Sequence, residues 1–337
     1  MRRRRGQSWL AAVATTLMLL TAILVRLQPN AQVQTVAAAA AEGGSVDLNR
    51  SPWFGMRLLH EPVALYGIDA NLKTAPAITA AAGILVDADT GRVLWSQNPH
   101  MRLAPASTIK LLTALVVLEN FDPARLITVT PNALTQQWDE SKMGLKPGDR
   151  LTVQELLTGM LTVSANDAAD AIAIDTVGLE RFIGAMNAQV GALGLDDTHA
   201  ASPVGLDDPD TYSSAYDLAA LASVDTQRFS LFDDIVRQHY VQLPATALHS
   251  EFDLNNLNLL LSMYAPAIGI KTGYTGNAGG CLVGEAVRGG HRLISVVLNA
   301  NLVYSQSRRL LDWGFTQFGL PTQLPSPSPS PSPSPHH

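Results

Sequence analysis

The sequence predicts an α+β fold in which an antiparallel sheet, flanked by helices, carries a mostly helical insertion. Three observations support this class: a strand–turn–strand pattern over residues 77–97, an Ala-rich helical pattern over 151–190, and a second strand–turn–strand pattern over 279–300. We therefore expect the strands at the two ends of the folded region to pair in one sheet, with the helices between them as an insertion.

Each predicted element has its own local signal. The first hairpin, AAAGILVDADTGRVLWSQN, joins two strands through an Asp-Ala-Asp-Thr-Gly turn. Apolar residues at helical spacing predict a helix from Ser107 to about Leu118, and further helix in VQELLTGML and DAADAIAI. The second hairpin joins GGCLVGEAV to RLISVVLNA through a turn at Arg288 to His291, and SQSRRLLDWGFTQF predicts a closing amphipathic helix.

The N-terminal segment, residues 1–41, predicts export. Arg2 to Arg5 precede an apolar stretch from about Trp9 to Val25 and a run of alanines, which is typical of a signal peptide. We expect cleavage near Ala37 to Ala41; the alternative is an uncleaved signal anchor that attaches the chain to the membrane. In either case the rest of the chain is expected outside the cytoplasm, in the periplasm or at the outer face of the cytoplasmic membrane or cell wall.

The rest of the chain divides into three parts that differ in composition and in hydrophobic pattern. Residues 42–76 have little pattern and are expected to form a linker or loosely packed approach segment. Residues 77–319 contain all the predicted strands and helices and form the expected folded domain. Residues 320–337 are a Pro/Ser-rich, low-complexity tail that predicts a spacer or a disordered end.

The composition limits the classes of partner and cofactor. The chain has 337 residues, of which 47 % are hydrophobic, enough for a large core. The first 26 residues hold five of the 23 basic residues and no acid, so the remainder carries 18 basic and 29 acidic residues, a net charge of −11. This balance argues against nucleic acid as a partner. Cys281 is the only cysteine and the eight histidines lack metal-ligand spacing, so neither a metal nor another cofactor is expected.

A serine and a lysine three residues apart open the first predicted helix, in APASTIKLLTAL. At this spacing Ser107 and Lys110 share one helix face. Burial among the following apolar residues would lower the pKa of Lys110, so that its amine could take the proton of Ser107 and activate the serine as a nucleophile. The alternative is that Ser107 caps the helix while Lys110 extends along the surface to reach water.

Two further motifs carry polar groups that could complete such a site. In VSANDAAD, Ser164 and Asn166 could pass a proton and hold a substrate amide, or simply cap the helix that follows. In GIKTGYTGNAGG, Lys271 and Thr272 offer a charge and a hydroxyl at a strand edge, along which a substrate can lie as an added strand. The alternative there is a glycine-rich turn with a surface lysine.

In this order, the three motifs S-x-x-K, S-x-N and K-T-G resemble those of the low-molecular-mass penicillin-binding proteins, the serine D-alanyl-D-alanine carboxypeptidases. The resemblance covers about residues 77–318 and includes the segments ILVDADTGRVLW, ASTIKLLTAL, MGLKPGDRLTVQELLTGMLTVSANDAA, GIKTGYTGNAGGCLV and LLDWGF. It implies the penicillin-binding protein or serine β-lactamase-like transpeptidase fold. It also implies that residues 77–319 form a D,D-peptidase catalytic domain.

The resemblance implies a role for each residue of the first two motifs. Ser107 would form the acyl-enzyme and Lys110 would be its base. Ser164 would relay a proton to the leaving D-alanine, and Asn166 would orient both the substrate and Lys110. The implied reaction removes the terminal D-alanine from peptidoglycan stem peptides, and β-lactam antibiotics would acylate the same serine.

For the third motif, the resemblance implies substrate binding. Lys271 and Thr272 would recognise the terminal carboxylate of the peptide, with Gly273 and Tyr274 on the same strand edge. The backbone N–H groups of Ser107 and Tyr274 would form the oxyanion hole.

Three other functions stay open on these residues. A D,D-endopeptidase would use the same side chains, and a non-catalytic β-lactam or cell-wall sensor would keep the pocket without turnover. EFDLN, which starts at Glu251, spells the E-x-x-L-N of class A β-lactamases, but it begins 87 residues after Ser164 and 20 before Lys271, the wrong spacing for that enzyme. Ala165 stands where the carboxypeptidases usually carry glycine.

Overall fold

The computed structural model describes residues 56–60, 65–67 and 75–322. The predicted signal segment, and residues 323–337 of the predicted tail, lie outside the described residues. Every feature below belongs to the unit Pro52–His337. Within the described ranges, no helix combines the length and the apolar character needed to cross a membrane.

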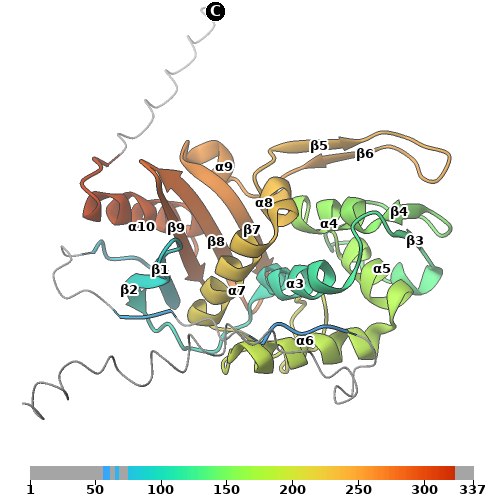
Figure 1. The fold of residues 1–337 in the computed structure, drawn as a ribbon, viewed down its shortest axis with the longest axis horizontal. Coiled ribbons are helices and arrows are strands. Elements are labelled where there is room, and N and C mark those ends of the chain that lie inside the picture. Colours follow the sequence, from blue (N-terminus) through green and yellow to red (C-terminus); the bar gives the residue numbers. More distant parts are fainter. Residues whose placement is uncertain (1–55, 61–64, 68–74, 323–337) are drawn as a thin grey trace, which may run out of the picture. The chain divides into compact units, whose positions relative to one another are not determined.

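Five antiparallel strands form the central sheet, in the order β2-β1-β9-β8-β7. Their bounds are β1 Ala82–Asp87, β2 Arg92–Gln97, β7 Ala267–Thr275, β8 Gly279–Arg288 and β9 His291–Leu298. The two predicted hairpins pair with each other through β1 and β9, with Val86 opposite Ile294. The strands at the two ends of the folded region therefore meet in one sheet, which confirms the predicted α+β class (Figure 1).

The insertion between β2 and β7 is mostly helical, as expected. Its helices are η1 Ala106–Ile109, α3 Lys110–Asn120, η2 Pro131–Ala133, α4 Val153–Thr162, α5 Asn166–Thr176, α6 Leu179–Leu193, α7 Ala215–Arg228, α8 Ser230–Val236 and α9 Leu260–Met263. It also contains two small hairpins, β3 Leu126–Thr128 with β4 Arg150–Thr152, and β5 Tyr240–Leu243 with β6 Phe252–Asn255. The helix α10, Val303–Gln317, follows the sheet at the predicted place.

Side chains of the sheet alternate between two apolar cores, one on each face. On β1, Ile84 and Val86 join the core that includes α3 to α8, whereas Leu85 joins the core that includes α9 and α10. This alternation follows from the two-residue period of a strand. Because both faces are covered, all six residues of β1 are buried and its sequence, AGILVD, is nearly continuous in apolar residues.

The structure differs from the predicted helices at two points beside the motifs. The helix expected from Ser107 begins as the 3-10 turn η1, and the α-helix starts only at Lys110. The helical region 151–190 is interrupted between α4 and α5, where Ser164 adopts a positive φ of 59°. The S-x-x-K and S-x-N motifs therefore each lie at a break in a helix, where backbone groups are free of the regular hydrogen-bond ladder.

Part of the expected linker packs against the domain. Met56, Leu59 and Leu65 are buried in the core that contains α3 to α7. The side-chain amide of Gln189 on α6 donates to the Leu59 carbonyl and accepts from the Leu59 N–H, both over 3.0 Å. For residues 56–60 and 65–67 this is closer packing than a linker has, so the apolar core begins ahead of Ala77.

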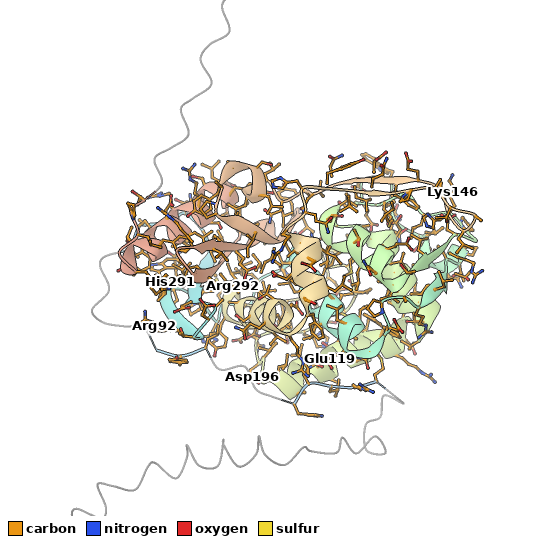
Figure 2. All side chains as sticks on the ribbon, turned by 45° about the horizontal axis from the view of Figure 1, so that its top comes forward. Arg92, Glu119, Lys146, Asp196, His291 and Arg292 are labelled. Atoms are coloured by element: carbon orange, nitrogen blue, oxygen red, sulfur yellow. The ribbon has the colours of Figure 1, made fainter. Side chains whose placement is uncertain are left out.

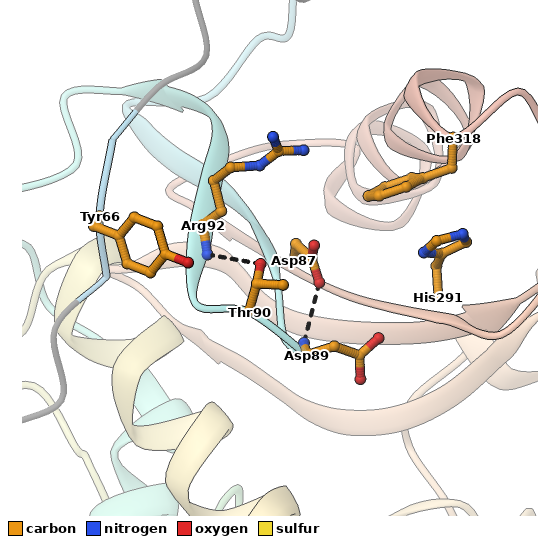
Figure 3. A pocket seen from close by; sticks show the side chains of 7 residues that line it. All are labelled: Tyr66, Asp87, Asp89, Thr90, Arg92, His291 and Phe318. Atoms are coloured by element: carbon orange, nitrogen blue, oxygen red, sulfur yellow. Dashed lines mark hydrogen bonds between the residues drawn. The ribbon is translucent and has the colours of Figure 1, made fainter.

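The β1–β2 turn has the predicted turn chemistry and lines a hollow of about 410 Å³. Asp87 Oδ1 accepts from the Asp89 N–H at 3.1 Å and Thr90 Oγ1 accepts from the Arg92 N–H at 3.3 Å (Figure 3). Aromatic rings stand on both sides of this turn in Figure 3, and its seven lining residues are Tyr66, Asp87, Asp89, Thr90, Arg92, His291 and Phe318. All seven lie outside the three motifs.

Candidate active site

The predicted serine and lysine meet at the junction of η1 and α3. Lys110 Nζ donates a hydrogen bond to Ser107 Oγ over 2.9 Å. The residues at the two N-cap positions here are Pro105 and Ile109, and neither position has a side-chain cap. The capping interpretation of Ser107 is therefore wrong, and the serine hydroxyl is paired with the lysine instead.

Lys110 lies in an environment that disfavours its charge. Its side chain is 0 % exposed, so it does not extend to water. Burial lowers the pKa of Lys110 to about 7, and the carboxylates of Asp170, Glu140 and Asp167 oppose that shift. Near neutral pH, a substantial fraction of the protein therefore holds Lys110 as a neutral amine that can accept a proton.

Three acceptors surround the Lys110 nitrogen. Besides Ser107 Oγ, Nζ donates to Asn166 Oδ1 at 2.7 Å and to the Val204 carbonyl at 2.9 Å. An ammonium can donate to all three, but a neutral amine has only two N–H groups and one lone pair. When the two carbonyl oxygens take the two N–H groups, the lone pair is left for the hydroxyl proton of Ser107. The arrangement is therefore suited to proton transfer from serine to lysine.

The two lysines of the motifs, Lys110 and Lys271, are buried, whereas two other lysines of the chain are exposed. Lys142 and Lys146 are exposed, and Lys146 lies at the surface at the upper right of Figure 2. Lys271 is 1 % exposed. The surface-lysine interpretation of the K-T-G segment is therefore wrong.

The K-T-G segment lies on β7, an edge strand of the sheet. Burial and the nearby charge of Lys110 hold the pKa of Lys271 well below its usual range, and Lys271 Nζ donates to the Thr272 carbonyl at 2.8 Å. The hydroxyl of Tyr304, on α10, donates to Thr272 Oγ1 at 3.4 Å. Tyr274 is 77 % exposed. The strand thus presents a hydroxyl and a buried lysine amine along an edge that a peptide can join.

Close backbone packing brings β7 against the serine. A Cβ added to Gly273 would lie 2.9 Å from the Ser107 backbone nitrogen and 3.0 Å from Ala106 Cβ. Ala106 itself has a positive φ of 48° and is 1 % exposed. A Cβ at Gly205 would lie only 2.1 Å from the Ala106 carbonyl oxygen. Two glycines therefore allow β7 and the 202–205 loop to approach η1 closely beside Ser107.

The S-x-N motif lies between α4 and α5 and caps neither helix. The N-cap position of α5 is Ala165, without a side-chain cap, and Asn166 is the first helical residue. Ser164 is 4 % exposed, and its hydroxyl has no hydrogen-bond partner among the described residues. Asn166 hydrogen-bonds to Lys110. Ser164 lies in the break between α4 and α5, and its hydroxyl makes no hydrogen bond in the described part of the chain. The capping interpretation is wrong for both residues.

Several groups at the site do not belong to any of the three motifs, and the sequence analysis did not identify them. Glu140 accepts from Asn166 Nδ2 at 2.6 Å, and the Val204 carbonyl accepts from Lys110. Two acids of α5 also make tertiary contacts: Asp167 accepts from three backbone N–H groups of residues 143–145, and Asp170 accepts from Gln136 Nε2 at 2.6 Å. These contacts join residues distant in sequence, so no local pattern announces them.

The E-x-x-L-N segment does not contribute to the site. Glu251 is exposed, and the residues after it form β6, which pairs with β5 in a two-stranded hairpin. This agrees with its spacing along the chain, which is wrong for the glutamate of a class A β-lactamase.

Comparisons with known proteins agree with the geometry. The peptidase S11 family model, described as D-alanyl-D-alanine carboxypeptidase, matches residues 69–302. D-alanyl-D-alanine carboxypeptidase DacF of Bacillus subtilis is 34 % identical over 277 residues, which cover 78 % of this chain and 69 % of DacF. DacB2 of Mycobacterium tuberculosis is 35 % identical over 73 % of this chain and 88 % of its own length. DacA of Escherichia coli is 34 % identical, but only 66 % of its length is covered.

Solved structures give the same result for the fold. A D-alanyl-D-alanine carboxypeptidase from Mycobacterium tuberculosis H37Rv has a TM-score of 0.69 and 33 % identity, and the match covers 77 % of this chain and 99 % of that one. The Streptomyces K15 DD-transpeptidase has a TM-score of 0.68 and 32 % identity over 72 % of this chain and 100 % of that one. The predicted fold and the predicted resemblance are both confirmed. The chain belongs to the peptidase S11 family of D-alanyl-D-alanine carboxypeptidases, which are hydrolases.

Proposed function

We propose that this protein is an exported serine D,D-carboxypeptidase that removes the terminal D-alanine from peptidoglycan stem peptides through a Ser107 acyl-enzyme. The observation that carries the proposal is the 2.9 Å contact between Ser107 Oγ and the Nζ of a fully buried lysine. Family membership supports the substrate class. β-Lactams, whose strained amide can accept the same attack, are the expected covalent inhibitors.

In the first step, Lys110 takes the Ser107 hydroxyl proton as Oγ attacks the carbonyl carbon of the penultimate D-alanine. The carbonyl electrons move to its oxygen, and the backbone N–H groups of Ser107 and Tyr274 are proposed to stabilise the resulting oxyanion. Lys271 and Thr272 would hold the terminal carboxylate. The close approach of β7 to η1 at Gly273 supports this arrangement, because it brings the carboxylate-binding strand beside the nucleophile.

Collapse of the tetrahedral intermediate breaks the C–N bond and releases D-alanine. The leaving amine needs a proton, and we assign Ser164 to pass it from Lys110. Its buried hydroxyl, free of partners in the described structure, supports this role. Water then attacks the acyl-enzyme ester while Lys110 takes a proton from it. The bond between the acyl carbon and Ser107 Oγ breaks, Lys110 returns the proton to Oγ, and the shortened peptide leaves with a new terminal carboxylate.

Intact-mass spectrometry of the purified protein with benzylpenicillin tests the nucleophile. One penicilloyl adduct is expected on the parent and none on Ser107→Ala. Release of free D-alanine from a peptide ending in D-Ala-D-Ala tests turnover. An adduct without D-alanine release would favour the sensor or the endopeptidase, and a parent that forms no adduct would overturn the proposal.

Export is proposed from the N-terminal segment alone, with residues 1–41 as the signal and 77–319 as the catalytic domain. The mass of the protein recovered from the cell envelope tests cleavage near Ala37 to Ala41. A full-length mass in the membrane fraction would support the uncleaved anchor, and recovery from the cytoplasm would contradict export.

A further inference from the structure

The loop between η2 and β4 brings a carboxylate into the site that none of the three motifs contains. Asn166 Nδ2 donates to Glu140 Oε2 at 2.6 Å, and Asn166 Oδ1 accepts from Lys110 Nζ at 2.7 Å. Lys110 Nζ in turn contacts Ser107 Oγ at 2.9 Å. Glu140 therefore ends a continuous chain of hydrogen bonds that begins at the serine.

The partners on either side fix the orientation of the Asn166 amide. An ionised Glu140 can only accept hydrogen bonds, so it must face the NH₂ group of the amide. Lys110 donates whether it is charged or neutral, so it faces the amide oxygen. With the amide turned over, its oxygen would meet the Glu140 carboxylate and its NH₂ group would meet Lys110. The second N–H of Asn166 remains for a substrate carbonyl.

The loop that carries Glu140 is itself held against α5. The Ser141 carbonyl accepts from the Asn166 N–H at 2.8 Å, and Glu140 Oε1 accepts from the Gln137 N–H at 2.8 Å. The Asp167 carboxylate accepts from the backbone N–H groups of residues 143–145 at 2.9–3.0 Å. The carboxylate of Glu140 is thus pre-organised beside Asn166 before any substrate arrives.

We propose that Glu140 is a positioning residue for acylation: it locks the Asn166 amide so that Oδ1 faces Lys110 and one Nδ2 hydrogen faces the substrate. The inference rests on the proposed function, since it concerns the same acyl transfer. It extends that function to a loop residue outside the motifs.

Glu140 also belongs to the set of charges that act on Lys110. Asp167 and Asp170 face the lysine from α5, Glu140 faces it from the loop, and Lys271 faces it from β7. Burial lowers the pKa of Lys110, and the three carboxylates oppose that shift by favouring the protonated lysine. Removal of the Glu140 charge should therefore lower the pKa of Lys110 and let acylation begin at lower pH.

The test compares three variants with the parent, using the second-order rate of benzylpenicillin acylation between about pH 5 and pH 10. Glu140→Gln removes the charge and lets the amide turn over. Glu140→Asp keeps the charge but withdraws the carboxylate by one CH₂ group. Asp139→Asn is the matched control, because Asp139 is the adjacent residue of the same loop, is exposed and carries the same charge. A thermal melt accompanies each variant.

For Glu140→Gln we expect a plateau rate roughly 10- to 100-fold below that of the parent. We also expect the acid limb of its pH–rate profile, where the rate rises with pH, to lie about 1 pH unit lower than that of the parent. Glu140→Asp should lose rate with an unchanged acid limb, and Asp139→Asn should match the parent in both respects.

A parental plateau in Glu140→Gln overturns the positioning role. An equal loss of rate in Asp139→Asn also overturns it. So does a Glu140→Gln variant that melts at a lower temperature and loses rate while the acid limb of its pH–rate profile stays in place. Both results indicate a general effect on the loop. Should Glu140→Gln fail to fold, Glu140→Asp decides the question. A lower plateau rate with an unchanged acid limb supports the positioning role, and a parental plateau rate overturns it. A parent that is not acylated overturns the proposed function itself, which separates the two failures.

Discussion

Gly273→Ala tests whether the contact between β7 and η1 sets the reaction geometry. Gly273 lies between Lys271 and Tyr274, which are proposed to bind substrate, and it packs against the backbone of Ser107, the proposed nucleophile. The substitution adds one methyl group and leaves every polar side chain of the site in place. A Cβ at this position would meet the Ser107 nitrogen at 2.9 Å, Ala106 Cβ at 3.0 Å and the Thr108 nitrogen at 3.1 Å.

The size of the effect follows from these distances. Ordinary van der Waals contact to a Cβ begins at 3.4 Å, so relief of the 2.9 Å contact requires a displacement of 0.5 Å. Two of the three atoms belong to the η1 backbone, so a side-chain rotation cannot relieve the overlap. A misplacement of about 1 Å can cost roughly 100-fold in rate, so half that distance predicts a loss of about 10-fold.

The assay is the rate of benzylpenicillin acylation, followed by mass, beside a thermal melt. Gly276→Ala is the matched control, because it lies just beyond β7 and its Cβ would meet only Asp207 Oδ2, at 3.9 Å. The control should acylate at the parental rate. A parental rate in Gly273→Ala, with the protein folded, would refute the claim that this spacing controls catalysis.

Three further predictions concern proton transfer, a buried acid and the N-terminal approach segment. Lys110→Arg is expected to lower the acylation rate about 10²- to 10⁴-fold, because a guanidinium keeps its proton; near-parental acylation would refute the base role. Burial raises the pKa of Asp225 well above its ordinary value of 3.8, and neither carboxyl oxygen has a partner among the described residues. The stability that the Asp225 proton contributes is complete below pH 3.8 and is lost as pH rises through the folded-state pKa. Asp225→Asn should therefore flatten the pH dependence of the free energy of unfolding in urea, and an unchanged pH dependence would contradict this. Gln189→Ala removes both hydrogen bonds to Leu59 and should lower the free energy of unfolding by about 2 kcal/mol while leaving acylation unchanged; the idea fails if chemical denaturation shows no loss.

Local patterns in the sequence predicted the strands of the two large hairpins and the helices α3 to α6 and α10, whereas the short strands β3 to β6 and the helices α7 to α9 were not predicted. Apolar runs joined by turn residues place both hairpins, and the resemblance carried by the three motifs places Ser107, Lys110 and Asn166 near each other. The break of the first helix into η1 and α3 was missed. It accompanies the close approach of Gly205 and Gly273 to η1, a tertiary contact that leaves no periodic signal in APASTIKLLTAL.

Contacts between distant segments account for the rest of what the sequence left unpredicted. Glu140 is 26 residues from Asn166, and Val204 is 94 residues from Lys110. Met56 and Leu59 lie in a stretch without periodic pattern, yet both are buried in the core, and Gln189 of α6 hydrogen-bonds to the Leu59 backbone. A carboxylate in an irregular loop gives the same sequence signal whether it faces solvent or a catalytic amide.

The properties of the site arise where the helical insertion meets the sheet. The insertion supplies the serine, the lysine and the asparagine, and the sheet supplies the edge strand β7, which packs on η1. Lys110 has a pKa of about 7 only because the two parts together exclude water and because Asp170, Glu140 and Asp167 limit the shift. A short S-x-x-K motif outside this junction would leave the lysine hydrated and protonated, unable to take the serine proton. The chemistry therefore depends on the packing between the two parts of the fold, and a change at Gly273 or Glu140 should alter it without touching the motif's own serine or lysine.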